Sequence, residues 1–142
     1  MRTTVLIGFP GETDKNFKEL IDFIQNVHFD HIGAFIYSDA QDLPSHHLSD
    51  HISNHIAQER YDQLMSCQAE ISLQMNRKHT GTVYDVLIEK AVGDNLFSGR
   101  TYFQAPEVDG TTYIHSKQLK IGSFVNARII DALEYDLAGE VA

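Results

Sequence analysis

A glycine-rich segment is the first place in this sequence where residue types and spacing could do chemistry. The run Gly8-Phe9-Pro10-Gly11-Glu12 lies between a short apolar stretch and an amphipathic one. Glycines at a strand-to-helix junction let the backbone approach a ligand closely, and a helix N-terminus favours a carboxylate or another anion. The spacing is not the dinucleotide fingerprint, and no phosphate-loop lysine follows it. The run is therefore either a ligand-contacting loop or a structural turn.

Four histidines, His46, His47, His51 and His55, form the second candidate site. If the last five residues of this cluster are helical, His51 and His55 share a face, as in an i, i+4 zinc pair. No glutamate stands between them as in a metalloprotease motif, and a polar loop explains the cluster equally well. The sequence leaves a metal site and a solvated loop both open.

The only cysteine, Cys67, falls in the middle of a predicted helix. One thiol can form no internal disulfide, and it cannot hold a zinc ion or an iron–sulfur cluster alone. No serine or cysteine lies in a recognisable nucleophile elbow. We therefore expect no catalytic residue within this chain, and we assign no residue as a metal ligand while the histidine cluster stays open.

The elements that must position these residues change character near Arg77. Residues 3–9 and 32–37 are apolar runs typical of buried strands, and a segment with helical periodicity separates them. This order predicts a βαβ unit with parallel strands. A second, long helix is expected at about residues 53–78. A lone parallel unit cannot cover both faces of its sheet, so this half is predicted to be the end of a larger barrel.

From residue 81 onward the hydrophobic period falls to two, which is typical of strands. Five short strands are predicted, at residues 82–91, 101–104, 111–115, 125–129 and 135–141. Asp109-Gly110 is a strong turn signal between two of them. Strands this short and numerous predict a small antiparallel barrel, which leaves no open edge. The predicted domains are therefore residues 1–76 and residues 77–142.

The charge favours a basic partner over a nucleic acid. The net charge is −9, with four basic and eleven acidic side chains in residues 1–76 and seven and nine in residues 77–142. Such a balance opposes binding to phosphate backbones and favours basic proteins, although acidity can also serve solubility alone. No apolar run is long enough to span a membrane and no signal peptide is evident, so a cytoplasmic location is expected.

Four segments resemble the radical-SAM methylthiotransferases, and together they cover essentially the whole chain. They are RTTVLIGFPGET at residues 2–13, FDHIGAFIYS at 29–38, RYDQLMSCQAEISLQMNRKHTG at 60–81 and GRTYFQAPEVDG at 99–110. The first two resemble late strands of the radical-SAM barrel. The third resembles the helix that joins this barrel to a TRAM domain, a small barrel that binds RNA or protein. The acidic fourth segment is similar to the RimO family, which modifies a ribosomal protein, and is normally missing from the tRNA-modifying MiaB branch.

The resemblance implies a fold and a set of site residues. The implied fold is the C-terminal βαβα piece of a partial TIM barrel followed by a five-stranded antiparallel, OB-like TRAM barrel. Residues that the family places beside S-adenosylmethionine are matched by Gly8, Phe9, Pro10, Gly11, Glu12, Phe35, Tyr37 and Ser38. The substrate-docking motif is matched by Arg100, Glu107 and Asp109. Residues 42–46 depart from the family's Gly-Thr-Pro-Ala-like loop, so no contact is assigned to them.

The family chemistry implied by the resemblance is methylthiolation of an aspartate of the basic ribosomal protein S-twelve. It needs S-adenosylmethionine and two 4Fe-4S clusters, each held by three cysteines that this chain lacks. The chain alone is therefore expected to be inactive and to serve cofactor placement and substrate docking. The alternatives are a fragment of the tRNA-adenosine branch, an RNA-binding TRAM module, or a protein-binding fragment without a catalytic half.

Overall fold

The computed structural model describes residues 1–142, and the chain forms two compact units, Met1–Ile71 and Ser72–Ala142. The division falls within the long helix α2 (Asn54–Arg77). None of the helices combines the length and the apolar character needed to cross a lipid bilayer.

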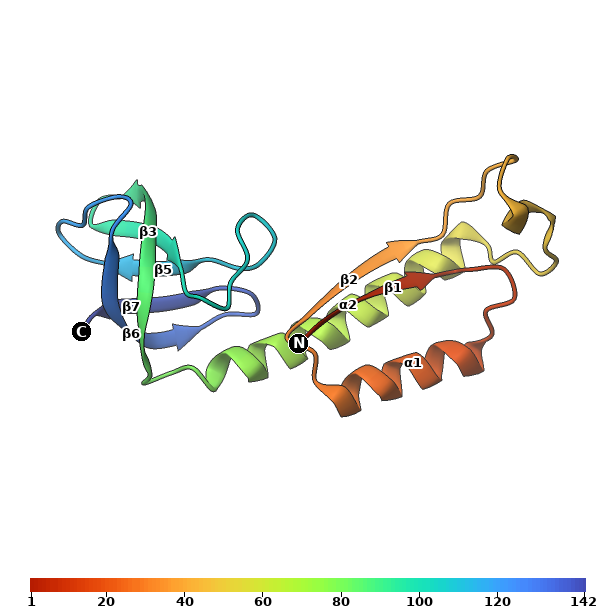
Figure 1. Ribbon diagram of the computed structural model, residues 1–142. Coiled ribbons are helices and arrows are strands. Elements are labelled where there is room, and N and C mark those ends of the chain that lie inside the picture. Colours follow the sequence, from red (N-terminus) through yellow and green to blue (C-terminus); the bar gives the residue numbers. More distant parts are fainter. The chain divides into compact units, whose positions relative to one another are not determined.

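The first unit is a βαβ arrangement followed by a helix. Strand β1 (Arg2–Ile7), helix α1 (Asp14–Val27) and strand β2 (His31–Ile36) follow one another, and a short 3₁₀ turn, η1 (Pro44–His47), precedes α2. The two strands pair in parallel over their whole length, which confirms the predicted parallel βαβ unit (Figure 1). Buried apolar side chains from both strands and both helices make the core: Ile7, Phe17, Ile24, Phe29, Ile32, Ala57 and Leu64.

Local hydrogen bonds and backbone conformation define the two ends of helix α1. Thr13 is the N-cap, and its side-chain oxygen accepts a hydrogen bond from the backbone N–H of Asn16, while the Asn16 side chain accepts one from the backbone N–H of Thr13. This reciprocal pair satisfies two backbone donors that the first turn leaves free. The helix ends at His28, which adopts the left-handed conformation. Thr13 thus holds the start of α1 directly behind the glycine-rich loop.

One face of the two-stranded sheet is uncovered. Leu6 and Phe35 are cross-strand partners on this face, with exposed fractions of 48% and 62%. Their neighbours Thr4 and Gly33 are exposed as well. An apolar pair in this position is a surface on which another element or a ligand can pack.

The second unit is a closed five-stranded barrel. Its strands are β3 (Val83–Gly93), β4 (Leu96–Arg100), β5 (Thr112–His115), β6 (Phe124–Ala132) and β7 (Leu137–Val141), arranged in the order β3-β4-β5-β7-β6 (Figure 1). Inward-facing residues alternate with outward-facing ones along β3 and β6. The core contains Val86, Ile88, Ile114, Ala127, Ile129, Ala132 and Leu137.

The barrel is mixed, so the predicted antiparallel barrel is wrong in this respect. Strands β5 and β7 pair in parallel, while the other four neighbouring pairs are antiparallel. The reason is geometric, because directions cannot alternate around a closed ring that has an odd number of strands. The predicted strand at residues 101–104 is also absent, since the chain leaves the sheet after Arg100 and forms a turn there.

Close contact between β3 and β4 predicts that Gly99 tolerates no side chain. A Cβ atom at Gly99 would lie 2.2 Å from the carbonyl oxygen of Leu87, whereas one at Gly93 would meet only the Leu96 side chain at 3.8 Å. We expect Gly99→Ala to lower the free energy of unfolding by at least about 2 kcal/mol, because backbone must move to relieve the clash. Urea unfolding followed by tyrosine fluorescence measures this. Gly93→Ala is the matched control with little effect, and equal stability of the two variants would contradict the expectation.

Candidate functional site

The glycine-rich loop lies at the C-terminal end of β1, where parallel sheets place their ligand-binding loops. Gly8 and Gly11 have φ values of 78° and 86°, in the region that favours glycine. A Cβ at Gly8 would come within 2.8 Å of the Ala57 Cβ on α2, while one at Gly11 would meet no atom within 4 Å. Gly8 is therefore required by helix packing, and Gly11 leaves open space at the loop surface.

Glu12 holds the loop together from inside. One carboxylate oxygen accepts a 3.0 Å hydrogen bond from the Gly8 backbone N–H, and the other lies 2.6 Å from Nη1 of Arg60 on α2. The side chains of Glu12 and Arg60 are only 13% and 9% exposed. Both carboxylate oxygens are thus occupied, so Glu12 ties the loop to α2.

Arg60 is the electrostatic centre of the first unit. Its Nη2 also contacts Oδ1 of Asp14 at 2.6 Å, and its guanidinium lies 5.7 Å from the centre of the Phe17 ring. Burial disfavours the charged guanidinium, but the hydrogen bonds to Asp14 and Glu12 outweigh it and raise the pKa of Arg60. Arg60 therefore stays charged and joins α2 to the loop and to the first turn of α1.

Aromatic side chains extend the loop toward the end of β2. The rings of Phe9 and Tyr37 meet edge to face with centres 5.3 Å apart. The Tyr37 hydroxyl hydrogen-bonds to Asp39 at 3.0 Å and to Ser45 at 2.9 Å. A cavity of about 550 Å³ begins at this edge, lined by Ile36, Tyr37, Ser38, Asp39, Asn54 and Gln58. The structure thus groups the glycine-rich loop with Tyr37 and Ser38, whereas Phe35 lies on the uncovered sheet face.

The histidine cluster lies in the segment between β2 and α2, and its side chains do not converge on a metal site. Nδ1 of His46 lies 2.8 Å from Asp39, and Nε2 of His51 lies 3.2 Å from the His46 carbonyl oxygen. The hydrogen bond from His46 lowers the pKa of Asp39 below its usual range, and the Tyr37 hydroxyl acts in the same direction. His55 faces Glu59 instead. No group of three His, Cys, Asp or Glu side chains is arranged to hold a metal ion.

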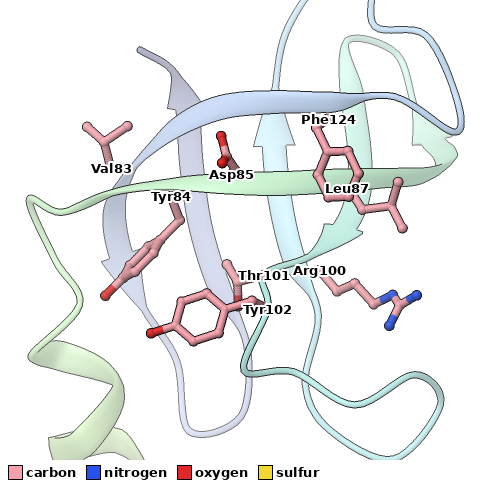
Figure 2. Close-up of a pocket in the computed structure, with 8 residues that line it drawn as sticks. All are labelled: Val83, Tyr84, Asp85, Leu87, Arg100, Thr101, Tyr102 and Phe124. Atoms are coloured by element: carbon pink, nitrogen blue, oxygen red, sulfur yellow. The ribbon is translucent and has the colours of Figure 1, made fainter.

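A second candidate site is a groove of about 640 Å³ on the outside of the barrel. Figure 2 shows its lining, which comes from β3, the end of β4 and the start of β6: Val83, Tyr84, Asp85, Leu87, Arg100, Thr101, Tyr102 and Phe124. Leu87 is the cross-strand partner of both Arg100 and Phe124. Patterning alone missed this groove, because Phe124 on β6 becomes a neighbour of β3 only through barrel closure.

The three predicted docking residues share the edge of this groove and the loop that follows. Arg100 donates a 2.9 Å hydrogen bond from Nε to Glu89. Glu107 is exposed and adopts a left-handed backbone. Asp109 accepts a hydrogen bond from the Ala105 backbone N–H and so shapes the loop. The structure therefore leaves Glu107 as the most accessible acidic group of the three.

Gln104 anchors this loop to the barrel. Its side-chain oxygen accepts hydrogen bonds from the backbone N–H and hydroxyl of Thr101 and from the hydroxyl of Thr112. All three residues are buried. A buried amide oxygen with three donors is well satisfied, so the loop leaves β4 along a defined path.

Comparison with known proteins finds a family model for the barrel and relatives along the whole chain. The family model described as the TRAM domain matches residues 80–142. Residues 80–142 are a TRAM domain. The whole chain is similar to proteins named ribosomal protein uS12 methylthiotransferase RimO. It is 46% identical to that of Clostridioides difficile (strain 630) over 142 residues and 48% identical to that of Desulfosudis oleivorans over 141, each covering 99% of this chain.

These relatives confirm the resemblance to RimO proteins. The chain spans about a third of their length, 32% for both relatives, and it matches their C-terminal portion. The RimO protein of Desulforamulus reducens, at 43% identity, covers all of this chain. The TRAM domain and the preceding βαβ unit are thus found together in these proteins.

The buried ion pair predicts a large effect for Arg60. Arg60→Ala leaves the Glu12 carboxylate nearly buried without its partner, so we expect a loss of about 2–3 kcal/mol in the free energy of unfolding. Urea unfolding measures it. The combined variant Arg60→Met with Glu12→Gln should recover much of the loss, because no charge is then stranded. Lys18→Ala, which breaks the exposed pair with Asp22, is the control. An Arg60→Ala variant as stable as this control would refute the role of Arg60.

Proposed function

We propose that this chain is the C-terminal part of a radical-SAM methylthiotransferase that adds a methylthio group to an aspartate of ribosomal protein uS12. The supporting observation is identity of 40% or more along its whole length to proteins of that name. In this proposal residues 1–76 complete the cofactor side of the enzyme and residues 77–142 dock the substrate. A cytoplasmic location follows from a ribosomal substrate.

The first unit contributes surfaces for S-adenosylmethionine. The residues proposed for contact are Gly11 with its open face, the ring of Phe9, the exposed ring of Phe35, and Tyr37 with Ser38 at the cavity edge. Apolar rings and free loop backbone suit an adenosine and an amino-acid group. Gly8, Pro10 and Glu12 keep the loop in shape, since Glu12 is already bound to Arg60.

The radical chemistry belongs to groups that this chain does not hold. When bound, the cofactor and two 4Fe-4S clusters supply a radical that removes hydrogen from an unactivated carbon. A cluster needs cysteine thiolates, and Cys67 is the only cysteine. We therefore propose that this chain alone is inactive and that its residues orient the cofactor and the substrate.

The barrel is the proposed docking site for a basic protein. Glu107 is exposed at the tip of the loop, and Arg100 is neutralised by Glu89. The chain as a whole carries a net charge of −9, which attracts a basic ribosomal protein and speeds its encounter. Asp109 supports the contact by folding the loop that presents Glu107.

A second candidate function is binding of single-stranded RNA by the TRAM domain. The observation in its favour is the pair of exposed aromatic side chains, Tyr102 and Phe124, on which bases could stack. Against it, the groove that they border contains Asp85 and one arginine that is already paired. Phosphate recognition needs a stripe of free basic side chains, so we favour the protein partner.

Binding measured side by side tests this choice. The 142-residue chain is titrated with purified uS12 and with tRNA over a salt series. We expect binding to uS12, weakened at least about ten-fold in the Glu107→Lys variant because an attractive charge becomes repulsive. Glu134→Lys, at an exposed position in the barrel, makes the same change in net charge and serves as the control.

The opposite result would indicate that RNA is the partner of the barrel. Preferential binding to tRNA with a steep salt dependence, strengthened by Glu107→Lys, would mean that the barrel docks nucleic acid. Equal losses in the Glu107→Lys and Glu134→Lys variants would show that uS12 responds only to overall charge. Either outcome would contradict the docking role proposed for Glu107.

A further inference from the structure

We infer that the outer groove of the barrel binds an arginine side chain of a basic protein partner, with Asp85 as the residue that selects the cation. This inference deepens the proposed function, because it names the chemical group that the docking barrel recognises. Sequence patterning assigned no role to Asp85, Tyr102 or Phe124.

The groove has exposed aromatic walls. The side chains of Tyr102 and Phe124 are 87% and 70% exposed, and Val83 adds a further exposed apolar surface. In Figure 2 the Phe124 ring stands beside Leu87, and Tyr102 lies on the segment that follows β4. Large rings left open to solvent around a groove mark a place where another molecule packs.

The free charge in this groove is negative. Arg100 contributes the positive charge of the lining, but its guanidinium is paired with Glu89 and points away from Tyr102 in Figure 2. Asp85 is exposed on β3, and its side chain makes no hydrogen bond or ion pair. It stands between Val83 and Leu87 on the outward face of the strand. An unpaired carboxylate among apolar walls favours a cationic guest.

Arginine fits such a groove better than the alternatives. Its planar guanidinium can stack on an aromatic ring while its N–H groups donate to a carboxylate. A lysine ammonium is more strongly hydrated and lacks the flat face. A nucleic acid would place phosphates near Asp85, which repels them. The lining therefore combines the two features that a guanidinium uses.

Tyr102 stands at the edge of a cluster of aromatic side chains. Its ring packs edge to face against Phe103, with centres 5.2 Å apart, and lies 6.3 Å from the Tyr84 ring. His79 stacks on Phe103 and hydrogen-bonds to the Tyr84 hydroxyl. These packed neighbours reduce the number of ring positions open to Tyr102, which lowers the entropy lost when a partner binds.

An NMR titration of the 142-residue chain tests the inference. The probes are the peptide Ac-Gly-Arg-Gly-Arg-Gly-NH₂ and its analogue with neutral citrulline in place of arginine. We expect amide shifts at Asp85, Thr101 and Tyr102 with the arginine peptide and far weaker binding of the citrulline peptide. Asp85→Asn should weaken arginine binding about five-fold, the size of an exposed ion-pair contact, because the aromatic rings remain.

The control is Asp94→Asn, which changes the net charge equally at an exposed turn position between β3 and β4. It should leave arginine binding unchanged. Equal losses in the Asp85 and Asp94 variants, or shifts that avoid the groove, would overturn the inference. A hexauridylate that shifts the same amides and binds more tightly to Asp85→Asn than to the unmodified chain would also overturn it.

The outcomes separate this inference from the proposed function. Arginine-peptide binding in the groove without uS12 binding supports the groove and contradicts the proposed function. Binding of uS12 that depends on Glu107, together with arginine-peptide shifts outside the groove, supports the proposed function and overturns the arginine site.

Discussion

A closed ring of five strands must contain at least one parallel pair, and the rest of the second unit depends on this constraint. The parallel pair is β5 and β7. Strand β6 pairs with β7 on one side and closes the ring against β3 on the other. Strand β3 therefore has β4 on one side and β6 on the other, which sets Leu87 between Arg100 and Phe124. The outer groove depends on closure, because its Phe124 wall comes from β6, which is distant from β3 in the sequence.

In the first unit, many of the residues whose types suggested ligand binding instead make contacts that stabilise the fold. Glu12 and Arg60 lie 48 positions apart in the sequence, yet their ion pair joins the glycine-rich loop to α2. Gly8 makes room for Ala57, and Asp39 binds His46 and Tyr37. What remains for a ligand is apolar and backbone surface, chiefly Gly11 and the ring of Phe35. A loop braced in this way can present such surface in one conformation.

Periodicity predicted the parts of the fold that depend on neighbouring residues. It predicted both helices, the parallel pair β1 and β2 and the barrel, because burial repeats at 3.6 or 2 residues in them. It missed β4, because its small residues Ser98 and Gly99 are both buried and break the alternation. It also missed Gln104 and Asp85, since a buried amide and an unpaired carboxylate look like ordinary polar residues until their surroundings are known. The resemblance, carried by specific segments, predicted the RimO relationship that composition could not.

Photo-crosslinking shows which partner the outer groove of the TRAM barrel faces. A benzoylphenylalanine placed at Tyr102, or at the exposed control position Ile121, is irradiated in the 142-residue chain with uS12 and tRNA present together. We expect a crosslink to uS12 from position 102 and none from position 121, because the groove faces a basic protein. A crosslink from position 102 to tRNA, with uS12 untouched, would contradict it.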